Sequence, residues 1–245
     1  MTAIVSVRAL EKSYPLGDTS VEVLTGLDLE VHPSELVAVM GPSGVGKSTL
    51  LNCIAGLDAP DRGAVMVLDR DLATMDDNAR TLARRRAIGI IYQFFNLVPN
   101  LDVTENVLLP YLIDGERPDE AAVERALDRV WMKHRRDHLP SQLSGGEMQL
   151  VSIARAIARA PKLILADEPT GNVNVATGRK IMNLLAEVLV ETKSAMLLVT
   201  HNPDDAARAH RVVFLQDGRI DPDASLTGDE VSVHAIHERL EKLGI

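Results

Sequence analysis

A glycine-rich segment between an apolar run and a helical pattern constrains the fold of this 245-residue chain more than any other feature. Residues 36–40 are continuously apolar, which is typical of a strand buried on both faces of a parallel sheet. The next segment reads Gly41-Pro42-Ser43-Gly44-Val45-Gly46-Lys47-Ser48-Thr49. Glycines let the backbone curl until successive N–H groups face an anion. The pattern therefore predicts a strand, a phosphate-binding loop and a helix whose positive N-terminus faces the same phosphate.

The polar residues of this loop favour a nucleotide over a simple anion. Lys47 would supply a positive charge to the β- and γ-phosphates, and the Ser48 hydroxyl is suited to a Mg²⁺ ligand. The alternative is a chance glycine turn between a strand and a helix. We favour the nucleotide because every required position is filled and an apolar strand precedes the loop.

Two later segments carry matching chemistry. Leu143-Ser144-Gly145-Gly146-Glu147 offers a hydroxyl, bare amides and a helix N-terminus to a second anion. Asp167 ends the apolar run 163–166, so it would emerge at the strand's carboxyl edge and hold the Mg²⁺ shell, while Glu168 would deprotonate an attacking water. A helix cap or a solvated strand end would explain each segment alone. Two phosphate receptors in one chain instead predict a head-to-tail dimer around two nucleotides.

The histidines differ in their setting. His201 follows the apolar strand 197–200 at a sheet edge, where an imidazole suits contact with a γ-phosphate and a polarised water. A structural role at a strand end is the alternative for a lone histidine. His134 and His138 have helical spacing, but no third ligand accompanies them, so we expect a solvated face there and no zinc site.

Strand and helix patterns alternate along the chain, which predicts an α/β fold with a mainly parallel sheet. We expect a β-rich N-terminal region, a nucleotide-binding domain over 1–221, an inserted helical subdomain over about 94–160, and a tail over 222–245 with a helix within 230–243. The expected strands are Ile4–Val7, Val21–Val31, Leu36–Met40, Ala64–Leu68, Ile88–Tyr92, Leu163–Ala166, Met196–Thr200 and Val212–Leu215.

Composition narrows the class of protein further. The chain is 46% hydrophobic and 25% charged, as in soluble α/β proteins, and no apolar run reaches the roughly 18–20 residues that span a bilayer. Neither a secretion signal nor a cysteine pair is apparent, and the single Cys53 fits a reducing cytoplasm. The formal charge of −9 argues against nucleic acid as a partner.

The motifs together resemble the ATPase subunit of an ATP-binding cassette (ABC) transporter, a P-loop NTPase family, as far as about Gly218. In this resemblance residues 143–147 are the family signature, Asp167-Glu168 the second Walker motif, Gln93 the Q-loop residue and His201 the switch histidine. Tyr14 resembles the aromatic that stacks on adenine, with hydrophobic packing as the alternative. The sequence around Gln93 is similar to the corresponding sequence in the branch of lipoprotein-releasing, macrolide-exporting and cell-division ATPases (LolD-, MacB- and FtsE-like).

The resemblance implies a homodimer that binds two Mg-ATP molecules, hydrolyses ATP and drives a separate FtsX- or MacB-like membrane permease. Lys47 and the loop amides would bind phosphate, Ser48, Gln93 and Asp167 would shape the Mg²⁺ site, and Glu168 would be the general base. Residues 144–147 would act on the partner's nucleotide. The protein would lie on the inner face of the cell membrane through its permease. Regulation of a cell-wall hydrolase and a soluble, non-transport ABC ATPase are the alternatives.

The chain departs from the family pattern at two places. Met148-Gln149-Leu150 stands where the family often has Gln-Gln-Arg, and Gly171-Asn172-Val173-Asn174 where the branch usually has Gly-Asn-Leu-Asp. Asn174 keeps the shape of an aspartate, loses its charge and can also donate hydrogen bonds. We expect altered coupling between the two nucleotide sites.

An apolar cluster directly follows Gln93 in a chain that is only 3% aromatic. It is formed by Phe94, Phe95, Leu97, Val98 and Leu101. Packing between the core and the helical subdomain is the structural explanation for any one of them. The cluster also suits a surface that receives a cytoplasmic helix of the permease.

Overall fold

A computed structural model describes residues 2–72 and 74–244. The chain divides into two compact units. The first contains the residues up to Thr81 together with those from Ala195 onward, and the second contains Leu82–Ser194. The phosphate-loop motif and His201 therefore belong to the first unit, whereas Gln93, the 144–147 turn and the acidic pair belong to the second.

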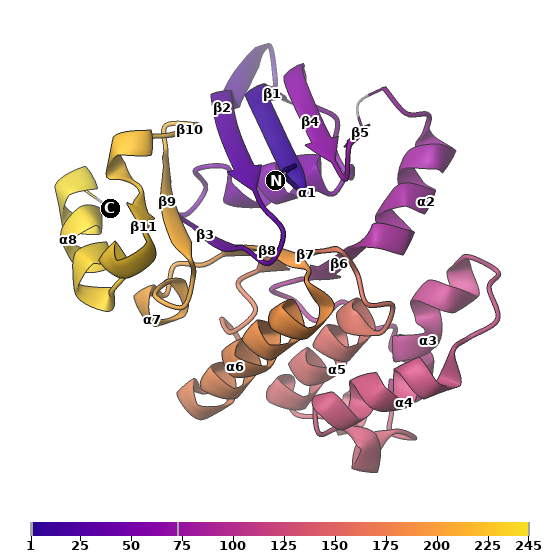
Figure 1. The fold of residues 1–245 in the computed structure, drawn as a ribbon. Coiled ribbons are helices and arrows are strands. Elements are labelled where there is room, and N and C mark those ends of the chain that lie inside the picture. The colour runs from indigo at the N-terminus through magenta and orange to yellow at the C-terminus, as the bar shows by residue number, and fades with distance from the viewer. Residues whose placement is uncertain (1, 73, 245) are drawn as a thin grey trace. The chain divides into compact units, whose positions relative to one another are not determined.

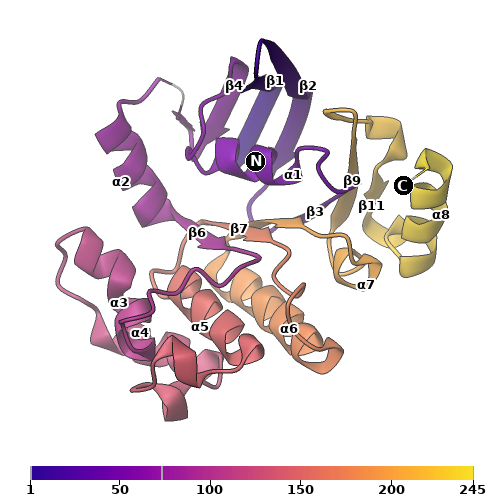
Figure 2. The ribbon, with the colours of Figure 1, turned by 180° about the vertical axis from the view of Figure 1, so that it is seen from behind.

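An antiparallel sheet forms one layer of the first unit. Its strands are β1 (Val5–Leu16), β2 (Thr19–Val31), β4 (Arg62–Val67) and β5 (Arg70–Asp71), in the order β2-β1-β4-β5. The polar turn at Gly17 joins β1 to β2, and both strands extend toward that turn beyond their apolar cores. Helix α1 (Lys47–Ile54) packs against this sheet, as both ribbon views show (Figures 1 and 2).

The other strands of the first unit surround β3 (Leu36–Met40), whose five residues are all buried. It pairs in parallel with β8 (Ala195–Val199) and β9 (Arg211–Gln216). Burial on both faces explains the continuous apolar sequence of β3. The short strands β10 (Arg219–Ile220) and β11 (Leu226–Thr227) pair antiparallel with β9. The tail contains the 3₁₀ turns Pro222–Ala224 and Gly228–Glu230 and ends in α8 (Val233–Leu243), which packs on α7 (Pro203–Ala206).

The second unit is largely helical around one parallel strand pair, β6 (Ile88–Ile91) and β7 (Leu163–Asp167). Its helices are α3 (Val103–Ile113), α4 (Glu120–Arg129), α5 (Gly145–Ile157) and α6 (Val175–Thr192), with 3₁₀ turns at Lys133–Arg135 and Pro140–Gln142. Helix α5 lies at the centre and packs against α3, α4 and α6 (Figures 1 and 2). Asp119 caps α4, because its side chain accepts a hydrogen bond from the Ala122 amide.

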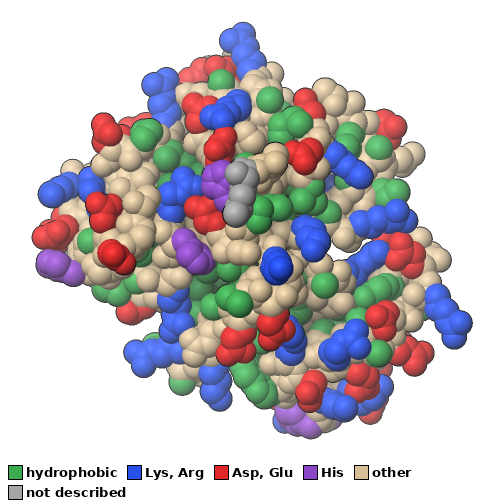
Figure 3. Space-filling view, viewed as in Figure 1, with side chains coloured by type: hydrophobic (Ala, Val, Ile, Leu, Met, Phe, Trp, Pro, Cys, Tyr) green, Lys and Arg blue, Asp and Glu red, His purple; other side chains and the backbone are tan. Residues whose placement is uncertain are grey.

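The sequence analysis places no helix over residues 77–87. Helix α2 (Asp77–Ala87) contains no buried residue and ends in Arg84, Arg85 and Arg86. A helix without a buried stripe gives no apolar periodicity, which is the signal that identifies helices from sequence. Across the part of the chain that the structure describes, no helix is both long and apolar enough to span a bilayer. On the face drawn in Figure 3, basic and acidic side chains are interspersed.

Candidate nucleotide site

The glycine-rich loop follows β3 without a break and needs glycine at two positions. Gly41 has a φ of +155°, and a Cβ there would lie 2.2 Å from the Leu215 carbonyl oxygen. Gly46 has a φ of +109°, and a Cβ there would lie 2.8 Å from Val23 Cγ1. A side chain at either position would displace the loop. Residues 42–45 are exposed or half-buried, so an incoming phosphate can approach the N–H groups of Ser43 and Gly44.

Lys47 begins α1 directly after the loop and is only 7% exposed. Its Nζ donates hydrogen bonds to the carbonyl oxygens of Gly41 (2.8 Å) and Pro42 (2.7 Å). These bonds hold the ammonium group against the loop rather than in solvent. Ser48 and Thr49 follow in the first turn of α1, with Ser48 exposed. The strand, loop and helix that the sequence predicts are all present.

Tyr14 lies on β1 with its hydroxyl fixed and its ring partly open. The hydroxyl donates to Asp58 Oδ2 at 2.5 Å, and Lys12 Nζ lies 5.1 Å from the ring centroid. Burial raises the pKa of Tyr14, and the bond to Asp58 adds to that rise. Because the residue remains 37% exposed, its ring retains a surface on which a planar base can stack.

His201 occupies the junction between β8 and α7. Thr200 before it is 2% exposed, and its hydroxyl accepts a hydrogen bond from the Asn202 amide at 3.0 Å. Asn202 in turn caps α7 through the Asp204 amide. These contacts fix the backbone on both sides of His201, whose side chain is exposed.

In the second unit the structure brings Gln93 and Glu168 together. Strand β7 ends at Asp167, and Glu168 follows with a φ of +45°, a conformation that costs a non-glycine residue roughly 1–3 kcal/mol. Gln93 Nε2 donates to Glu168 Oε2 at 3.3 Å. Asn172 Nδ2 donates to the Gln93 carbonyl at 2.7 Å, and the Gly171 amide donates to the Glu168 carbonyl at 3.0 Å. The backbone conformation of Glu168 thus sets the direction of its side chain, and Gln93 donates a hydrogen bond to its carboxylate.

The 144–147 turn forms a complete capping box at the start of α5. The Ser144 amide and hydroxyl both donate to Glu147 Oε2 at 2.8 Å, and the Glu147 amide donates to Ser144 Oγ at 3.3 Å. Arg135 Nε donates to the other Glu147 oxygen at 3.2 Å. The bonds from Ser144 and the Arg135 charge lower the pKa of Glu147 below its ordinary value. The helix N-terminus is therefore preformed, with Ser144 exposed at its tip.

Asn174 caps α6. Its Oδ1 accepts a hydrogen bond from the Thr177 amide at 2.9 Å. An aspartate would accept the same bond, so the departure from the branch pattern preserves this capping contact. In the segment 148–150 the departures are Met148 and Leu150, whereas Gln149 between them matches the family pattern. Gln149 is 1% exposed on α5 and donates to the Tyr92 carbonyl at 3.5 Å.

The apolar cluster after Gln93 divides by exposure. Phe94 is 70% exposed, whereas Phe95, Leu97, Val98 and Leu101 are half-buried. A Cβ added at Gly145 would lie 3.6 Å from the Phe95 ring, so Phe95 packs beside the start of α5. Within this cluster only Phe94 presents most of its side chain to solvent.

Comparison with known proteins identifies the family. The ABC transporter family matches residues 24–171. The lipoprotein-releasing system ATP-binding protein LolD of Pseudomonas fluorescens is 46% identical over 89% of this chain and 97% of its own, and LolD of Gluconobacter oxydans is 44% identical over 88% and 94%. The ATP-binding cassette MJ0796, solved as a dimer bound to ADP and Pi, has a TM-score of 0.85 at 36% identity, covering 91% of this chain and 98% of its own.

The chain belongs to the ABC transporter family and is an ATP-binding subunit with ATPase activity. The α/β fold predicted from the sequence is confirmed by this likeness, as is the resemblance to the branch that contains LolD.

The sequence analysis did not predict that Arg155 and Asn172 contact the segment 92–96, called the Gln93 loop below. Arg155 on α5 donates to the carbonyls of Phe95 and Asn96, and Asn172 donates to that of Gln93. The available signal was an arginine at position 155 inside the apolar stripe of α5, where a cation needs a nearby acceptor. The identity of that acceptor depends on the loop backbone, which periodicity does not describe.

Replacement of Gly41 tests the geometry of the phosphate loop. Gly41→Ala should lower the free energy of unfolding by at least about 3 kcal/mol, because positive-φ strain adds to a backbone clash. It should also weaken binding of a fluorescent ATP analogue. Gly17→Ala is the control, since Gly17 has a φ of +59° but open space around it, and should cost only about 1 kcal/mol. Equal stability and nucleotide affinity of the Gly41 variant and wild type would contradict the required geometry.

Asn174 offers a separate test of the branch departure. Asn174→Asp should keep the α6 cap and the melting temperature, whereas Asn174→Ala should lose about 1 kcal/mol. We expect the aspartate variant to change the ATPase rate or its cooperativity, which rate-versus-ATP curves measure. Superimposable curves for Asn174→Asp and wild type would show that the departure is silent.

Proposed function

We propose that this ATPase works as a homodimer that closes around two ATP molecules and drives a separate membrane permease in lipoprotein release. The observation that carries the proposal is the preformed turn at 144–147, a second anion receptor beyond the loop at 41–46. The names of the LolD relatives and the dimeric state of MJ0796 support it. Such a partner places the protein on the inner face of the cell membrane, through an FtsX- or MacB-like permease.

Each nucleotide-binding role rests on a local observation. The amides of residues 41–46 and the ammonium group of Lys47 bind the phosphates, and Tyr14 stacks on adenine. His201 contacts the γ-phosphate. The turn at 144–147 of one subunit binds the nucleotide held by the other, which its exposed tip and capped helix N-terminus support.

The residues proposed for Mg²⁺ offer the oxygen donors that this ion prefers. They are the Ser48 hydroxyl, the Gln93 carboxamide and the Asp167 carboxylate. No group of three or more His, Cys, Asp or Glu residues suited to a metal occurs among the described residues. A hydroxyl, a carboxamide and a single carboxylate fit Mg²⁺, because this ion is usually held by one or two carboxylates plus substrate phosphates. The ion would neutralise charge on the phosphate oxygens.

The hydrolytic step assigned to this site is the attack of a water oxygen on the γ-phosphorus. The bond from that phosphorus to the β–γ bridging oxygen breaks, ADP leaves, and Glu168 takes the proton of the water. The bond from Gln93 Nε2 to Glu168 Oε2 supports this assignment, because it orients the Glu168 carboxylate.

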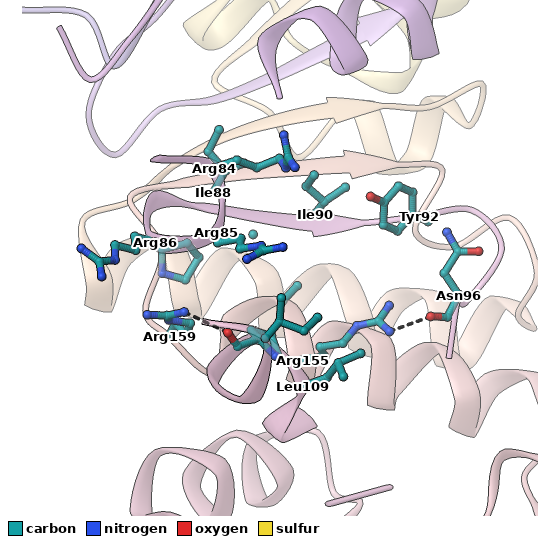
Figure 4. A pocket seen from close by; sticks show the side chains of 15 residues that line it. Arg84, Arg85, Arg86, Ile88, Ile90, Tyr92, Asn96, Leu109, Arg155 and Arg159 are labelled. Atoms are coloured by element: carbon teal, nitrogen blue, oxygen red, sulfur yellow. Dashed lines mark hydrogen bonds between the residues drawn. The ribbon is translucent and has the colours of Figure 1, made fainter. Parts of the chain in front are cut away.

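A cavity of about 340 Å³ in the second unit supplies the permease-binding surface. Apolar residues from β6 and α3 form part of its wall, and arginines surround it (Figure 4). Arg85 and Arg159 bond the Asp114 carboxylate, which is shielded from solvent, at 3.3 and 2.6 Å. Five arginines line the cavity: Arg84, Arg85, Arg86, Arg155 and Arg159. Arg85, Arg86 and Arg159 are already paired with Asp114 and Glu116. The apolar wall therefore carries the match, which is to the apolar face of an amphipathic cytoplasmic helix.

Glu168→Gln tests the hydrolytic role. The variant should bind ATP with wild-type affinity yet turn over roughly 10²–10⁴-fold more slowly, because the amide does not accept the proton. It should also accumulate as an ATP-bound dimer in size-exclusion chromatography. Glu120→Gln, at an exposed glutamate of α4 in the same unit, should behave as wild type. Near-normal turnover of the Glu168 variant would remove Glu168 as the base.

A charge placed in the cavity wall tests permease binding. Ile113 is 50% exposed and lines the cavity, so Ile113→Asp should abolish co-purification with the permease while keeping the thermal unfolding curve. Truncation of such apolar anchors typically costs about 2 kcal/mol or more of binding energy. Val190→Asp is the control, because Val190 is 71% exposed on α6 outside the cavity and should leave co-purification intact. Normal binding by a folded Ile113 variant would place the permease elsewhere.

A further inference from the structure

Side chains hold four of the five backbone carbonyls between residues 92 and 96. The Tyr92 carbonyl accepts from Gln149 at 3.5 Å, and the Gln93 carbonyl accepts from Asn172 at 2.7 Å. Arg155 donates to both of the remaining two, at 3.0 Å to Phe95 and at 2.6 Å to Asn96. A loop outside regular secondary structure thus has nearly all of its acceptors bound by side chains.

Arg155 makes the strongest of these contacts. Two of its N–H groups converge on adjacent carbonyls from a half-buried position on α5, and a charged hydrogen bond of this kind contributes about 1.5–3 kcal/mol. Figure 4 shows its side chain extended toward the Asn96 backbone. Asn96 has a φ of +50°, so the loop turns at the point that Arg155 binds. A strained turn of this type persists where its surroundings hold it.

Gln149 joins the same helix to the start of the loop. It is 1% exposed, and its Oε1 is one of two buried side-chain atoms without a hydrogen-bond partner among the described residues. A buried glutamine is costly when half of its amide is unsatisfied. The other half of the amide, Nε2, donates to the Tyr92 carbonyl just before Gln93.

Helix α5 connects these contacts to the anion-binding turn. It begins at Gly145, beside the Phe95 ring, and carries Gln149 and Arg155 on one rigid element. Arg155 also lines the cavity assigned above to the permease. At the other end of the loop segment, Gln93 Nε2 contacts Glu168 Oε2.

We propose that Arg155 is a positioning residue that fixes the Gln93 loop and thereby sets the orientation of Gln93 against Glu168. A movement of α5, or of whatever fills the cavity, then reaches Gln93 through the two carbonyls that Arg155 binds. This inference rests on the proposed function of Glu168. Its structural half, the fixing of the loop, is independent of that assignment.

The test compares Arg155→Met with wild type in the full chain. Methionine keeps the apolar stem and removes both donors. We expect kcat for ATP to fall about tenfold or more, because a small displacement of an orienting residue is costly, while KM changes less than about twofold. Hydrogen–deuterium exchange of the amides in 93–98 should become faster. These two readouts separate loop positioning from a general loss of packing.

Arg129→Met is the matched control. Arg129 ends α4 in the same unit and pairs with Glu191 instead of the loop, so its loss should change neither kcat nor loop exchange. An unchanged kcat or unchanged loop exchange in Arg155→Met would overturn the proposal, as would equal changes in the control. If Arg155→Met does not fold, Arg155→Lys decides. It keeps the charge but cannot present the same two-pronged donor, so it should give an intermediate kcat and exchange rate, and wild-type values would overturn the proposal.

The outcome is separable from that of the general-base assignment. Normal turnover in Glu168→Gln would reject Glu168 as the base and leave the exchange measurement on Arg155→Met unaffected. Faster loop exchange with an unchanged kcat would instead reject the link from Arg155 to catalysis, whatever the role of Glu168.

Discussion

Backbone N–H and C=O groups at the ends of strands and helices lack partners within the element and must be hydrogen-bonded by other groups. In the functional segments of this protein, side chains make these hydrogen bonds. Lys47 binds the two carbonyls that directly follow β3, and Ser144 and Asn174 accept hydrogen bonds from amides in the first turns of α5 and α6. The Gln93 loop is held through its carbonyls in the same way. In each case the partner is a side chain close to the proposed chemistry, so the contact that satisfies the backbone also fixes a functional group.

The sequence predicted the buried strands well, because burial on both faces requires continuous apolar residues. It did not predict the short strands β5, β10 and β11 or the outer part of β1, which are largely not buried. Strand β3 and most of β7 are buried throughout, and both appear as unbroken apolar runs that end in a functional motif. The loop at 41–46 could also be predicted from the sequence, because Gly41 and Gly46 have positive φ and no room for a Cβ. At each of these positions the structure excludes most other residue types, so the residue that is present identifies the structure.

The remaining features depend on contacts that a sequence does not display. Helix α2 has no buried face and therefore no periodicity. The hydrogen bond from Gln93 to Glu168 joins residues 75 positions apart in the sequence, and the hydrogen bond from Arg155 to the Phe95 carbonyl joins residues 60 positions apart. Asn174 was expected to matter for its missing charge, but its structural contact is a cap that asparagine and aspartate make equally well. Its identity is constrained locally even though its effect on coupling remains a prediction.

Arginine has two distinct uses around the cavity of the second unit, and the difference follows from what each guanidinium faces. Arg159 binds the Asp114 carboxylate, which is shielded from solvent. Desolvation alone would raise the pKa of Asp114, yet the bonds from Arg159 and Arg85 hold that pKa below its ordinary value. That carboxylate stays charged at neutral pH, and its ion pairs secure the end of α3. Arg155 binds carbonyls, which do not titrate, and burial lowers the pKa of its own guanidinium below the ordinary value. A loop held in this way responds to displacement of the helix that carries the arginine, which is the property that a relay between a permease and an ATPase site requires.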